Sequence, residues 1–339
     1  MKVLIVKLTS MGDLIHVLPA VSDAVKQIPN IRFDWVADEA FADIPRMHQA
    51  VDEVIVTANR RWKKELWQSL KSGEFIRVWR NIRKKKYDIV IDAQSNLKSA
   101  VIMSFARGLR CGVDKDCTRE KFAHVTCDKT FHIPLEQHAI LRQRKLFAAS
   151  LGYPVPETSP DFGIDIEKLP ALPITLPDSY LVFVHSTTWD TKHWPEGYWQ
   201  QLIRMAASAG YHVVLPWGGV KEKERAERLA SQSSQAIVLP RLSIPQLARV
   251  MCESKGAVCV DTGLGHLTAA LNVPAVHLYG PTDPALIGAT GQHQHHLIAQ
   301  YECAPCYLHE CKWGSESACF LKNMKPEKVW SHFSPIIKQ

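Results

Sequence analysis

Gly256-Ala-Val-Cys-Val260 is an apolar run that ends in the loop Asp261-Thr-Gly-Leu-Gly-His266, and apolar residues at helical spacing follow. The order of strand, glycine-bearing loop and helix is the repeating unit of α/β proteins. The same order opens the chain, where Lys2–Lys7 leads into Leu8-Thr-Ser-Met-Gly12 and a helical stretch. Both stretches therefore predict strands of a parallel sheet that helices cover on both faces.

Further apolar runs extend both series. In the first half we expect strands at Arg32–Val36, Glu53–Val56 and Asp88–Asp92, and a helix at Ala100–Arg107. In the second half we expect strands at Tyr180–His185, His212–Leu215, Ile237–Leu239 and Ala275–Tyr279, a helix at Glu222–Ser231, and a capping box at Ser243-Ile-Pro-Gln246. The fold class is therefore α/β, with a βαβ series in each half.

A proline-rich connector separates the two series. Its prolines are Pro154, Pro156, Pro160, Pro170, Pro173 and Pro177. A chain of 339 residues is long enough for two domains. We predict an N-terminal domain at 1–165, a linker at 166–178, a C-terminal domain at 179–322, and a helix at 323–339 that packs back on the first domain.

The composition restricts the location and the partners. Lys7 interrupts the first apolar run, so no export signal forms, and no apolar stretch reaches the roughly 18 residues that span a bilayer. We expect a cytoplasmic protein with reduced cysteines. The formal net charge of +7 predicts an anionic partner: nucleic acid, a phosphorylated metabolite or a membrane surface.

Two loops of the second half have the residues of a phosphate site, at the strand ends where open α/β sheets bind ligands. The glycines of Asp261–His266 permit close backbone approach, and the helix behind them offers free N–H groups, although an ordinary tight turn has the same spacing. Thr187, Thr188 and Lys192 supply hydroxyls and a cation for a diphosphate leaving group, or form a solvated loop. Because no G-x-G-x-x-G is present, an oxidoreductase with a dinucleotide site is disfavoured.

Asp13 begins the first helix, directly after Gly12. An acid at this position is favourable for the helix dipole. It can also act as a general base that removes a proton from an acceptor hydroxyl. The dipole would keep this carboxylate ionised, so its position rather than strong basicity would have to supply the effect.

A basic stretch with interleaved tryptophans runs from Arg60 to Lys86. Its cations are Arg60, Arg61, Lys63, Lys64, Lys71, Arg77, Arg80, Arg83, Lys84, Lys85 and Lys86, and Trp62, Trp67 and Trp79 lie among them. The stretch is either a solvated helix face or a contact surface for phosphates at a membrane interface. Nucleic acid is the competing partner, but no recognised binding motif accompanies the charge.

Four cysteines lie near the C-terminus at Cys303, Cys306, Cys311 and Cys319, with metal-like spacing in the first pair only. They are either zinc ligands or packing thiols, and the irregular spacing favours packing. We predict that His293, His295 and His296 are exposed in a polar loop.

Six segments resemble the ADP-heptose:lipopolysaccharide heptosyltransferases, above all heptosyltransferase I, and they cover nearly the whole chain in order. They are Lys7-Leu-Thr-Ser-Met-Gly-Asp-Leu-Ile-His-Val-Leu-Pro19, Asp92-Ala-Gln-Ser95, Lys192-His-Trp-Pro195, Leu215-Pro-Trp-Gly218, Asp261-Thr-Gly-Leu-Gly-His-Leu-Thr-Ala-Ala270 and Tyr279-Gly-Pro-Thr-Asp-Pro284. The segment Cys303–Cys319 instead looks like the tails of the heptosyltransferase II branch. The alternative is therefore an enzyme that adds heptose to a heptose acceptor.

The resemblance implies a GT-B fold with two Rossmann-like domains facing across a cleft. It also implies inverting transfer of L-glycero-D-manno-heptose from ADP-heptose to a Kdo residue of Kdo-lipid A, without a metal or another cofactor. The expected enzyme is a monomer that contacts the cytoplasmic face of the inner membrane and binds no nucleic acid.

Site residues follow from the same resemblance. The catalytic residues are Asp13, as the base, and Lys192. The donor site comprises Thr187, Thr188, Lys192, Pro216, Trp217, Gly218, Glu222, Asp261, Thr262, Gly263 and His266; within it Pro216, Trp217 and Gly218 line the adenine pocket, and Glu222 and Asp261 bind sugar hydroxyls. The acceptor site comprises Ser10, Met11, Gly12, Arg60, Arg61, Lys63, Lys64 and Arg119.

Overall fold

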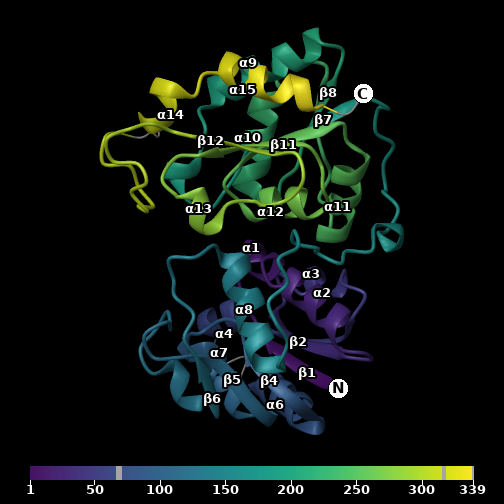
Figure 1. The fold of residues 1–339 in the computed structure, drawn as a ribbon. Helices are drawn as coiled ribbons and strands as arrows, with labels where there is room; N and C mark the ends of the chain where they lie inside the picture. The colour runs from purple at the N-terminus through teal and green to yellow at the C-terminus, as the bar shows by residue number, and fades with distance from the viewer. Residues whose placement is uncertain (66–70, 315–317, 338–339) are drawn as a thin grey trace. The chain divides into compact units, whose positions relative to one another are not determined.

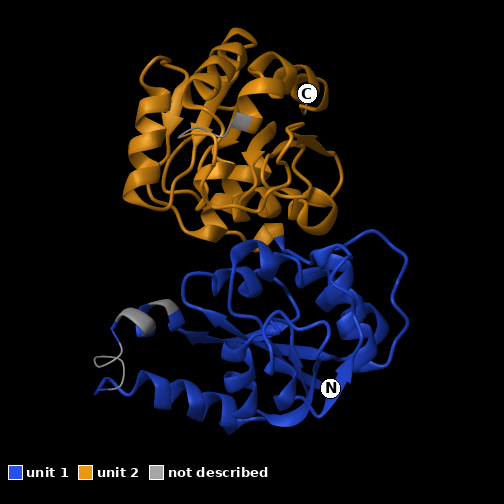
Figure 2. Cartoon of the chain, turned by 90° about the vertical axis from the view of Figure 1, so that its left-hand side faces the viewer, with its two compact units in different colours: residues 1–165 blue, residues 166–339 orange. Residues whose placement is uncertain are grey.

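The computed structural model describes residues 1–65, 71–314 and 318–337 (Figure 1). The chain divides into two compact units, Met1–Asp165 and Ile166–Gln339 (Figure 2). Each unit contains its own six-stranded sheet, and every strand pairing in both sheets is parallel. Each unit is therefore an α/β domain of the predicted kind.

The sheet of the first unit has the strand order β3-β2-β1-β4-β5-β6. Its strands are β1 (Lys2–Val6), β2 (Arg32–Asp38), β3 (Val51–Thr57), β4 (Lys86–Asp92), β5 (Arg107–Val113) and β6 (Lys129–Phe131). The helices described in this unit are α1 (Met11–Ile15), α2 (Leu18–Gln27), α3 (Asp43–Arg46), α4 (Asn59–Lys64), α6 (Glu74–Lys84), α7 (Leu97–Ser104) and α8 (Ala139–Leu151), together with the 3₁₀ turn η1 (Ala123–Thr126).

Side chains that alternate along these strands build a core on each face of the sheet. On one face, Leu4 and Val90 pack with Ile82 of α6 and Met103 of α7. On the other face α2 packs against α8, and Phe33 of β2 meets Phe147 of α8 with ring centroids 6.4 Å apart. The two layers of helices leave the carboxyl ends of the strands as the edge where loops gather.

The sheet of the second unit has the order β12-β11-β10-β7-β8-β9. Its strands are β7 (Tyr180–Val184), β8 (His212–Leu215), β9 (Ala236–Val238), β10 (Gly256–Val260), β11 (Ala275–Tyr279) and β12 (Gln294–Ile298). Its described helices are α9 (Glu196–Ser208), α10 (Val220–Ala230), α11 (Ile244–Glu253), α12 (Gly263–Ala270), α13 (Pro284–Ile287), α14 (Ala318–Asn323) and α15 (Pro326–Phe333), with the 3₁₀ turns η2 (Ile166–Lys168), η3 (Asp190–Lys192) and η4 (Ser334–Ile336).

The two sheets have the same connectivity. Counted within its own unit, each runs 3-2-1-4-5-6, the order of a Rossmann domain. The order reverses between β1 and β4 in the first unit and between β7 and β10 in the second. Ligands of such sheets bind beyond the carboxyl ends of the strands at this switch point. The loops after these four strands are therefore where the site should be sought.

Most predicted strands are confirmed. His212–Leu215, Gly256–Val260 and Ala275–Tyr279 have the predicted bounds. The capping box before α11 is also confirmed, since Ser243 N–H donates to Gln246 Oε1 at 2.9 Å and Gln246 N–H donates to Ser243 Oγ at 3.4 Å.

The predicted helix Ala100–Arg107 was wrong at its end. The helix runs from Leu97 to Ser104, and Arg107 begins β5. That strand reads Arg-Gly-Leu-Arg-Cys-Gly-Val, so its arginines and glycines hide the apolar pattern of a strand. β6 and α8 were also missed. His295 and His296 are exposed as predicted, but they belong to β12 rather than to a loop.

The C-terminal segment was predicted to pack back on the first domain. Its described packing is with the second unit, because α15 contacts α9 and β11. Val329 and Phe333 lie fully buried in that unit's core, and Phe333 packs so close to Gly256 that a Cβ there would lie 3.0 Å from its ring. None of the helices in the described part of the chain has the length and apolar character needed to cross a membrane.

Candidate active site

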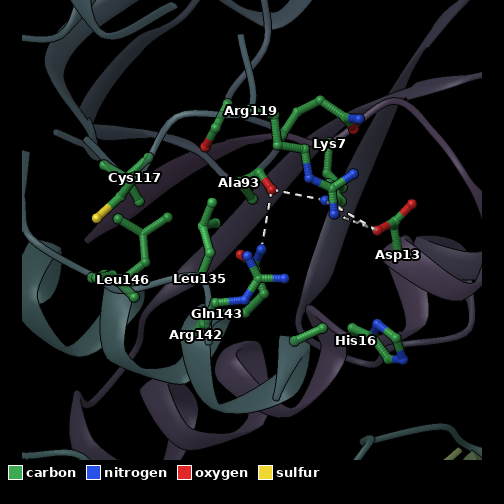
Figure 3. Close-up of a pocket in the computed structure, with 15 residues that line it drawn as sticks. Lys7, Asp13, His16, Ala93, Cys117, Arg119, Leu135, Arg142, Gln143 and Leu146 are labelled. Carbon is green, nitrogen blue, oxygen red and sulfur yellow. Dashed lines mark hydrogen bonds and ion pairs between the residues drawn. The ribbon is translucent and has the colours of Figure 1, made fainter. Parts of the chain in front are cut away.

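Asp13 lies in the first turn of α1, beyond the carboxyl end of β1. Its Oδ2 accepts hydrogen bonds from Ser10 N–H at 3.0 Å and from Ser10 Oγ at 2.9 Å. Its Oδ1 lies 3.2 Å from Arg119 Nη2 and 3.9 Å from Lys7 Nζ. These three charged side chains point toward one another in the pocket (Figure 3). Ser10 thus fixes the carboxylate, while two cations face its other oxygen.

Lys7 is the residue of this group that the sequence reasoning missed. It is almost fully buried at the end of β1, and its ammonium donates a hydrogen bond of 2.9 Å to the carbonyl of Ala93, just after β4. Burial lowers the pKa of Lys7 to about 8, although the nearby Asp13 carboxylate opposes this change. The sequence did contain a signal for Lys7. A lysine directly after a buried strand is a cation that needs a partner, so it predicts a nearby carboxylate or carbonyl.

The charges around Asp13 decide its protonation. Burial by itself would raise the pKa of the Asp13 carboxyl. Lys7, Arg119 and the Ser10 N–H outweigh burial and hold that pKa well below its ordinary value. Asp13 is therefore an ionised and weakly basic carboxylate, and its position must supply much of any general-base effect.

A pocket extends from Asp13 toward α8 (Figure 3). Gln94 closes one side and accepts hydrogen bonds from Leu8 N–H and Thr9 N–H. Gln143 donates to the Ala93 carbonyl at 3.2 Å, and Arg142 lines the same wall. Within the described residues, Nε of Arg142 is buried without a hydrogen-bond partner. The pocket combines a carboxylate with several cations, which suits a hydroxylated and anionic ligand.

The predicted acceptor residues have different environments. Ser10, Met11 and Gly12 share the loop and helix start that carry Asp13, and Arg119 contacts Asp13 directly. Arg61 is instead paired with two carboxylates, since its guanidinium lies 3.1 Å from Glu39 Oε2 and 3.0 Å from Glu74 Oε2. The side chains of Arg60, Lys63 and Lys64 lie outside the part of the structure that is described.

Lys192 and Asp261 form the centre of the second unit's switch point. Lys192 Nζ lies 2.7 Å from Asp261 Oδ2, and Thr282 Oγ1 donates to the same oxygen at 2.6 Å. Thr187 Oγ1 donates to the Asp261 carbonyl at 3.1 Å, and His266 Nε2 lies 4.0 Å from Asp261 Oδ1. The loops after β7 and β10 therefore bring these predicted donor residues together.

Electrostatics keep Asp261 ionised. Burial by itself would raise the pKa of its carboxyl, but Lys192, His266 and Thr282 lower it below the ordinary value. The Lys192 ammonium also lies over the ring of Trp189, 4.2 Å from its centroid. One carboxylate and one aromatic face thus hold this cation in place.

The N-terminus of α12 faces the same loops. Thr262 is its N-cap and makes no side-chain capping bond, so first-turn N–H groups remain for a ligand. Gly265 packs closely on the sheet, since a Cβ there would lie 3.3 Å from Cys259 Cβ and from His277 Nδ1. A helix start with Gly263, beside a lysine and two hydroxyls, suits a phosphate.

The predicted adenine loop follows β8. Pro216 is buried and Trp217 is half-buried, and the Trp217 indole N–H donates to the Leu239 carbonyl at 2.5 Å. Glu222 accepts a hydrogen bond of 2.6 Å from Gly218 N–H. Glu222 therefore supports the turn of this loop. Thr188 is exposed beside Thr187.

Two Rossmann-like units, one with a carboxylate and the other with a phosphate-type loop at its switch point, define a nucleotide-sugar transferase of the GT-B class. Residues 75–315 match glycosyltransferase family 9, the heptosyltransferases. The chain belongs to this family.

Similar proteins agree with this assignment. Lipopolysaccharide heptosyltransferase 1 of Pseudomonas aeruginosa is 48% identical over 314 residues, which cover 92% of this chain and 88% of the relative. The structure of Escherichia coli heptosyltransferase WaaC with ADP-2-deoxy-2-fluoro heptose superimposes with a TM-score of 0.84, at 41% identity and 99% coverage of both chains. Lipopolysaccharide heptosyltransferase 2 of Salmonella typhimurium is more distant, at 27% identity over 64% of this chain and 66% of the relative.

Proposed function

We propose that this chain transfers L-glycero-D-manno-heptose from ADP-heptose to a Kdo residue of Kdo-lipid A, with inversion and without a metal in the chemical step. One observation carries the proposal. The Asp13 carboxylate lies between Lys7 and Arg119 at the switch point of the first unit, in a chain 48% identical to a lipopolysaccharide heptosyltransferase 1. The low identity to heptosyltransferase 2 disfavours a heptose acceptor.

The donor diphosphate binds, in this proposal, at the start of α12. Gly263 and its neighbours offer backbone N–H groups there, while Lys192 and His266 offer side-chain donors. As the bond from the anomeric carbon to the phosphate oxygen breaks, its electron pair stays on ADP. Preorganised donors stabilise that developing charge and are the largest expected contribution to the rate.

Asp261 has a second role in this proposal. It pairs with Lys192 at 2.7 Å, which holds the lysine in position. The incoming diphosphate shares that cation, and the carboxylate can then accept hydrogen bonds from donor hydroxyls. Thr187 and Thr188 complete the phosphate contacts, and Pro216, Trp217 and Gly218 contact adenine.

The acceptor hydroxyl gives its proton to Asp13 while its oxygen attacks the anomeric carbon from the side opposite ADP. Because the pKa of Asp13 is held low, proton transfer must occur late, when bond formation has made the hydroxyl acidic. Kdo is a sugar acid, and its carboxylate suits Arg119 and the unpartnered Nε of Arg142. Orientation of both substrates adds several kcal/mol.

Contact with the inner membrane is proposed for α6 and its surroundings. Phe75, Ile76 and Trp79 are exposed on this helix, among the cations Arg77, Arg80 and Arg83. Exposed aromatic side chains ringed by cations suit the surface of an anionic membrane. We propose that the enzyme is a monomer that reaches its lipid acceptor from this side.

A panel of donors and acceptors tests the function. ADP release is measured with ADP-heptose or ADP-glucose, and with Kdo-lipid A or the same lipid already carrying one heptose. We expect efficient release only with ADP-heptose and the unmodified Kdo-lipid A. Preference for the heptosylated lipid would assign the chain to the heptosyltransferase II reaction instead.

A further inference from the structure

Three different metal-ligand groups meet near the carboxyl ends of β5 and β6. The ligand atoms of Asp114, Cys117 and His132 all lie within 4.8 Å of one another. Cys117 Sγ lies 3.7 Å from His132 Nδ1, and that nitrogen lies 2.8 Å from Asp114 Oδ2. A thiol sulfur, an imidazole nitrogen and a carboxylate oxygen are the kinds of ligand that zinc takes in proteins. The proposed function uses none of these three side chains.

Main-chain contacts hold the three residues at this point. β5 and β6 pair in parallel, with Val113 opposite Phe131. Asp114 and His132 are the next residues along the two strands, so they lie side by side. A tight turn then returns the chain, because Cys117 N–H donates to the Asp114 carbonyl at 3.2 Å. The cluster therefore depends on the sheet and its turn rather than on the chance approach of long surface side chains.

The Asp114 carboxylate is oriented for a ligand role. Its Oδ1 accepts hydrogen bonds from Asp116 N–H at 3.2 Å and from Cys117 N–H at 3.1 Å. These two bonds fix the plane of the carboxylate, and its other oxygen faces the imidazole of His132. Hydrogen bonds from the surrounding loop orient metal-binding carboxylates in the same way.

The distances between the ligand atoms suit a tetrahedral ion. Zinc bonds of about 2.0–2.3 Å at tetrahedral angles separate a sulfur from a nitrogen ligand by roughly 3.6 Å, and an oxygen from a nitrogen ligand by roughly 3.3 Å. The sulfur–nitrogen distance of 3.7 Å matches the first value. The oxygen–nitrogen distance of 2.8 Å must open by about 0.5 Å to reach the second. Rotation of the His132 side chain, which is 65% exposed, provides this change.

We propose that Asp114, Cys117 and His132 bind one zinc ion, with water as the fourth ligand. The Cys117 thiol loses its proton to solvent, and the imidazole binds through Nδ1 as the tautomer that carries its proton on Nε2. No oxidation or reduction takes place. The thiolate and the carboxylate balance the charge of the divalent ion. The exposed edge of His132 gives the ion access from solvent.

The position of the site gives the ion a consequence for the acceptor. Arg119 lies two residues after Cys117, and both side chains line the pocket that contains Asp13 (Figure 3). An ion that fixes Cys117 therefore restrains the loop that presents Arg119 to Asp13. The ion has no part in the glycosyl transfer itself. This consequence rests on the proposed acceptor role of Arg119, whereas the zinc site does not.

Zinc titration into chelator-treated protein is the direct test. We expect about one zinc ion per chain in the wild type. His132→Gln is the first variant, because an exposed side chain can be exchanged without disturbing the core. Its Kd for zinc should rise at least about 100-fold, since loss of a hydrogen-bond partner behind a ligand alone costs about 10–100-fold. His295→Gln, exposed on β12 of the second unit, is the matched control and should bind zinc like the wild type.

Cobalt shows whether the thiol is a ligand. Co²⁺ binds the same nitrogen, oxygen and sulfur ligands as zinc, and a thiolate bound to it adds a charge-transfer absorption in the near ultraviolet. This absorption should disappear in Cys117→Ser. It should persist in Cys303→Ser, which exchanges an exposed thiol of the second unit. Equal melting temperatures of the metal-free proteins check that both variants fold.

Two results would overturn the proposal in the titration: a wild type that binds no stoichiometric zinc, or a His132→Gln variant that binds it as tightly as the wild type. The three side chains would then form only a hydrogen-bonded cluster. A cobalt absorption that Cys303→Ser removes and Cys117→Ser retains would place the ion elsewhere and overturn the proposal as well.

Acceptor kinetics test the consequence separately. Removal of zinc should raise the acceptor KM about two- to threefold, the lower range for coupling through packed neighbours, and leave kcat and ADP-heptose affinity unchanged. An unchanged KM after complete loss of zinc would overturn the link to Arg119. Stoichiometric zinc in a protein that fails the heptose-transfer assay would leave the metal site standing and defeat only the proposed function.

Discussion

The switch points of the two units lie at equivalent strands but carry different charged side chains. Each has an aspartate at the end of its fourth strand, Asp92 in the first unit and Asp261 in the second. Both carboxylate oxygens of Asp92 accept hydrogen bonds from the residues that follow it. The donors are Gln94 N–H, Ser95 N–H and the Ser99 hydroxyl. Asp261 pairs with Lys192 instead. The first unit can therefore present a separate carboxylate, Asp13, while the second presents a cation.

Asp13 and Asp261 also differ in the exposure of their side chains. The side chain of Asp13 is 24% exposed, whereas that of Asp261 is 4% exposed. An accessible carboxylate can meet a substrate hydroxyl, while a buried one can serve mainly to position its partner. The proposed roles of the two units, base chemistry in one and phosphate binding in the other, therefore depend on the side chains at the strand ends rather than on the fold. The following predictions test this division.

The largest effect is expected from Asp13→Ala, with Asp13→Asn as the variant that keeps the shape. Loss of a general base lowers kcat about 10²–10⁴-fold. ADP-heptose affinity should stay the same, because the donor residues belong to the second unit. Rapid-quench measurement of ADP release checks the effect on kcat, and calorimetric titration with ADP-heptose checks the donor affinity. A variant with near-normal kcat would mean that Asp13 is only a helix-dipole charge.

Lys192→Ala should have the next largest effect. Removing one preorganised group that stabilises the leaving diphosphate costs about 10²–10³-fold in kcat. This variant also leaves the buried Asp261 carboxylate without its partner, so part of the loss of activity would come from a less stable folded state. The double variant Lys192→Ala/Asp261→Asn removes that complication. If it recovers both Tm and activity, Lys192 has only a structural role.

Neutralising Arg60, Lys63 and Lys64 together should raise the KM for a lipid-bearing acceptor by up to about 100-fold, because each cation near an anionic surface contributes about 1 kcal/mol. High salt should reproduce this change in the wild type, since exposed charges are screened over about 8–10 Å. Exchange of the exposed Lys325 and Lys328 in the second unit is the matched control.

Arg61→Ala sharpens this test, because Arg61 is paired with Glu39 and Glu74. It should change the acceptor KM less than the triple exchange does. Loss of donor affinity in the triple variant would show that the assignment of binding to separate units is wrong. An unchanged acceptor KM would indicate that these cations only form a solvated helix face.

Arg119→Ala should raise the acceptor KM about tenfold, the lower range for a hydrogen bond to a charged group, because Arg119 is 44% exposed. Arg119 also helps to lower the pKa of Asp13. Asp13 acts ionised, so activity falls as the pH drops through its pKa, and removing Arg119 must move that fall to higher pH. The pH profile of kcat/KM checks this sign. Arg119→Lys keeps the charge and should keep the wild-type profile.

The smallest effect is expected from chelation. Turnover should continue in EDTA without added magnesium, because Lys192 supplies positive charge at the phosphate site. Activity that EDTA abolishes and magnesium restores would show that a metal, rather than Lys192, neutralises the diphosphate.

The sequence by itself determined the features that are local. Apolar runs of strand length predicted β8, β10 and β11 at their bounds, and Ser243 with Gln246 predicted the start of α11. The contiguous loop Asp261–His266 is local as well, and its role as a phosphate site stays a prediction. These features follow from neighbours along the chain, because periodicity and capping depend on residues a few positions apart.

Tertiary structure decided which distant side chains meet. Lys7 reaches a carbonyl 86 residues away, and Arg119 reaches Asp13 across 106 residues. Arg61 looked free in the basic stretch, but Glu39 and Glu74 neutralise it. Such contacts depend on the strand order and on burial in a low-dielectric site, where a charge needs a partner whatever its distance in sequence.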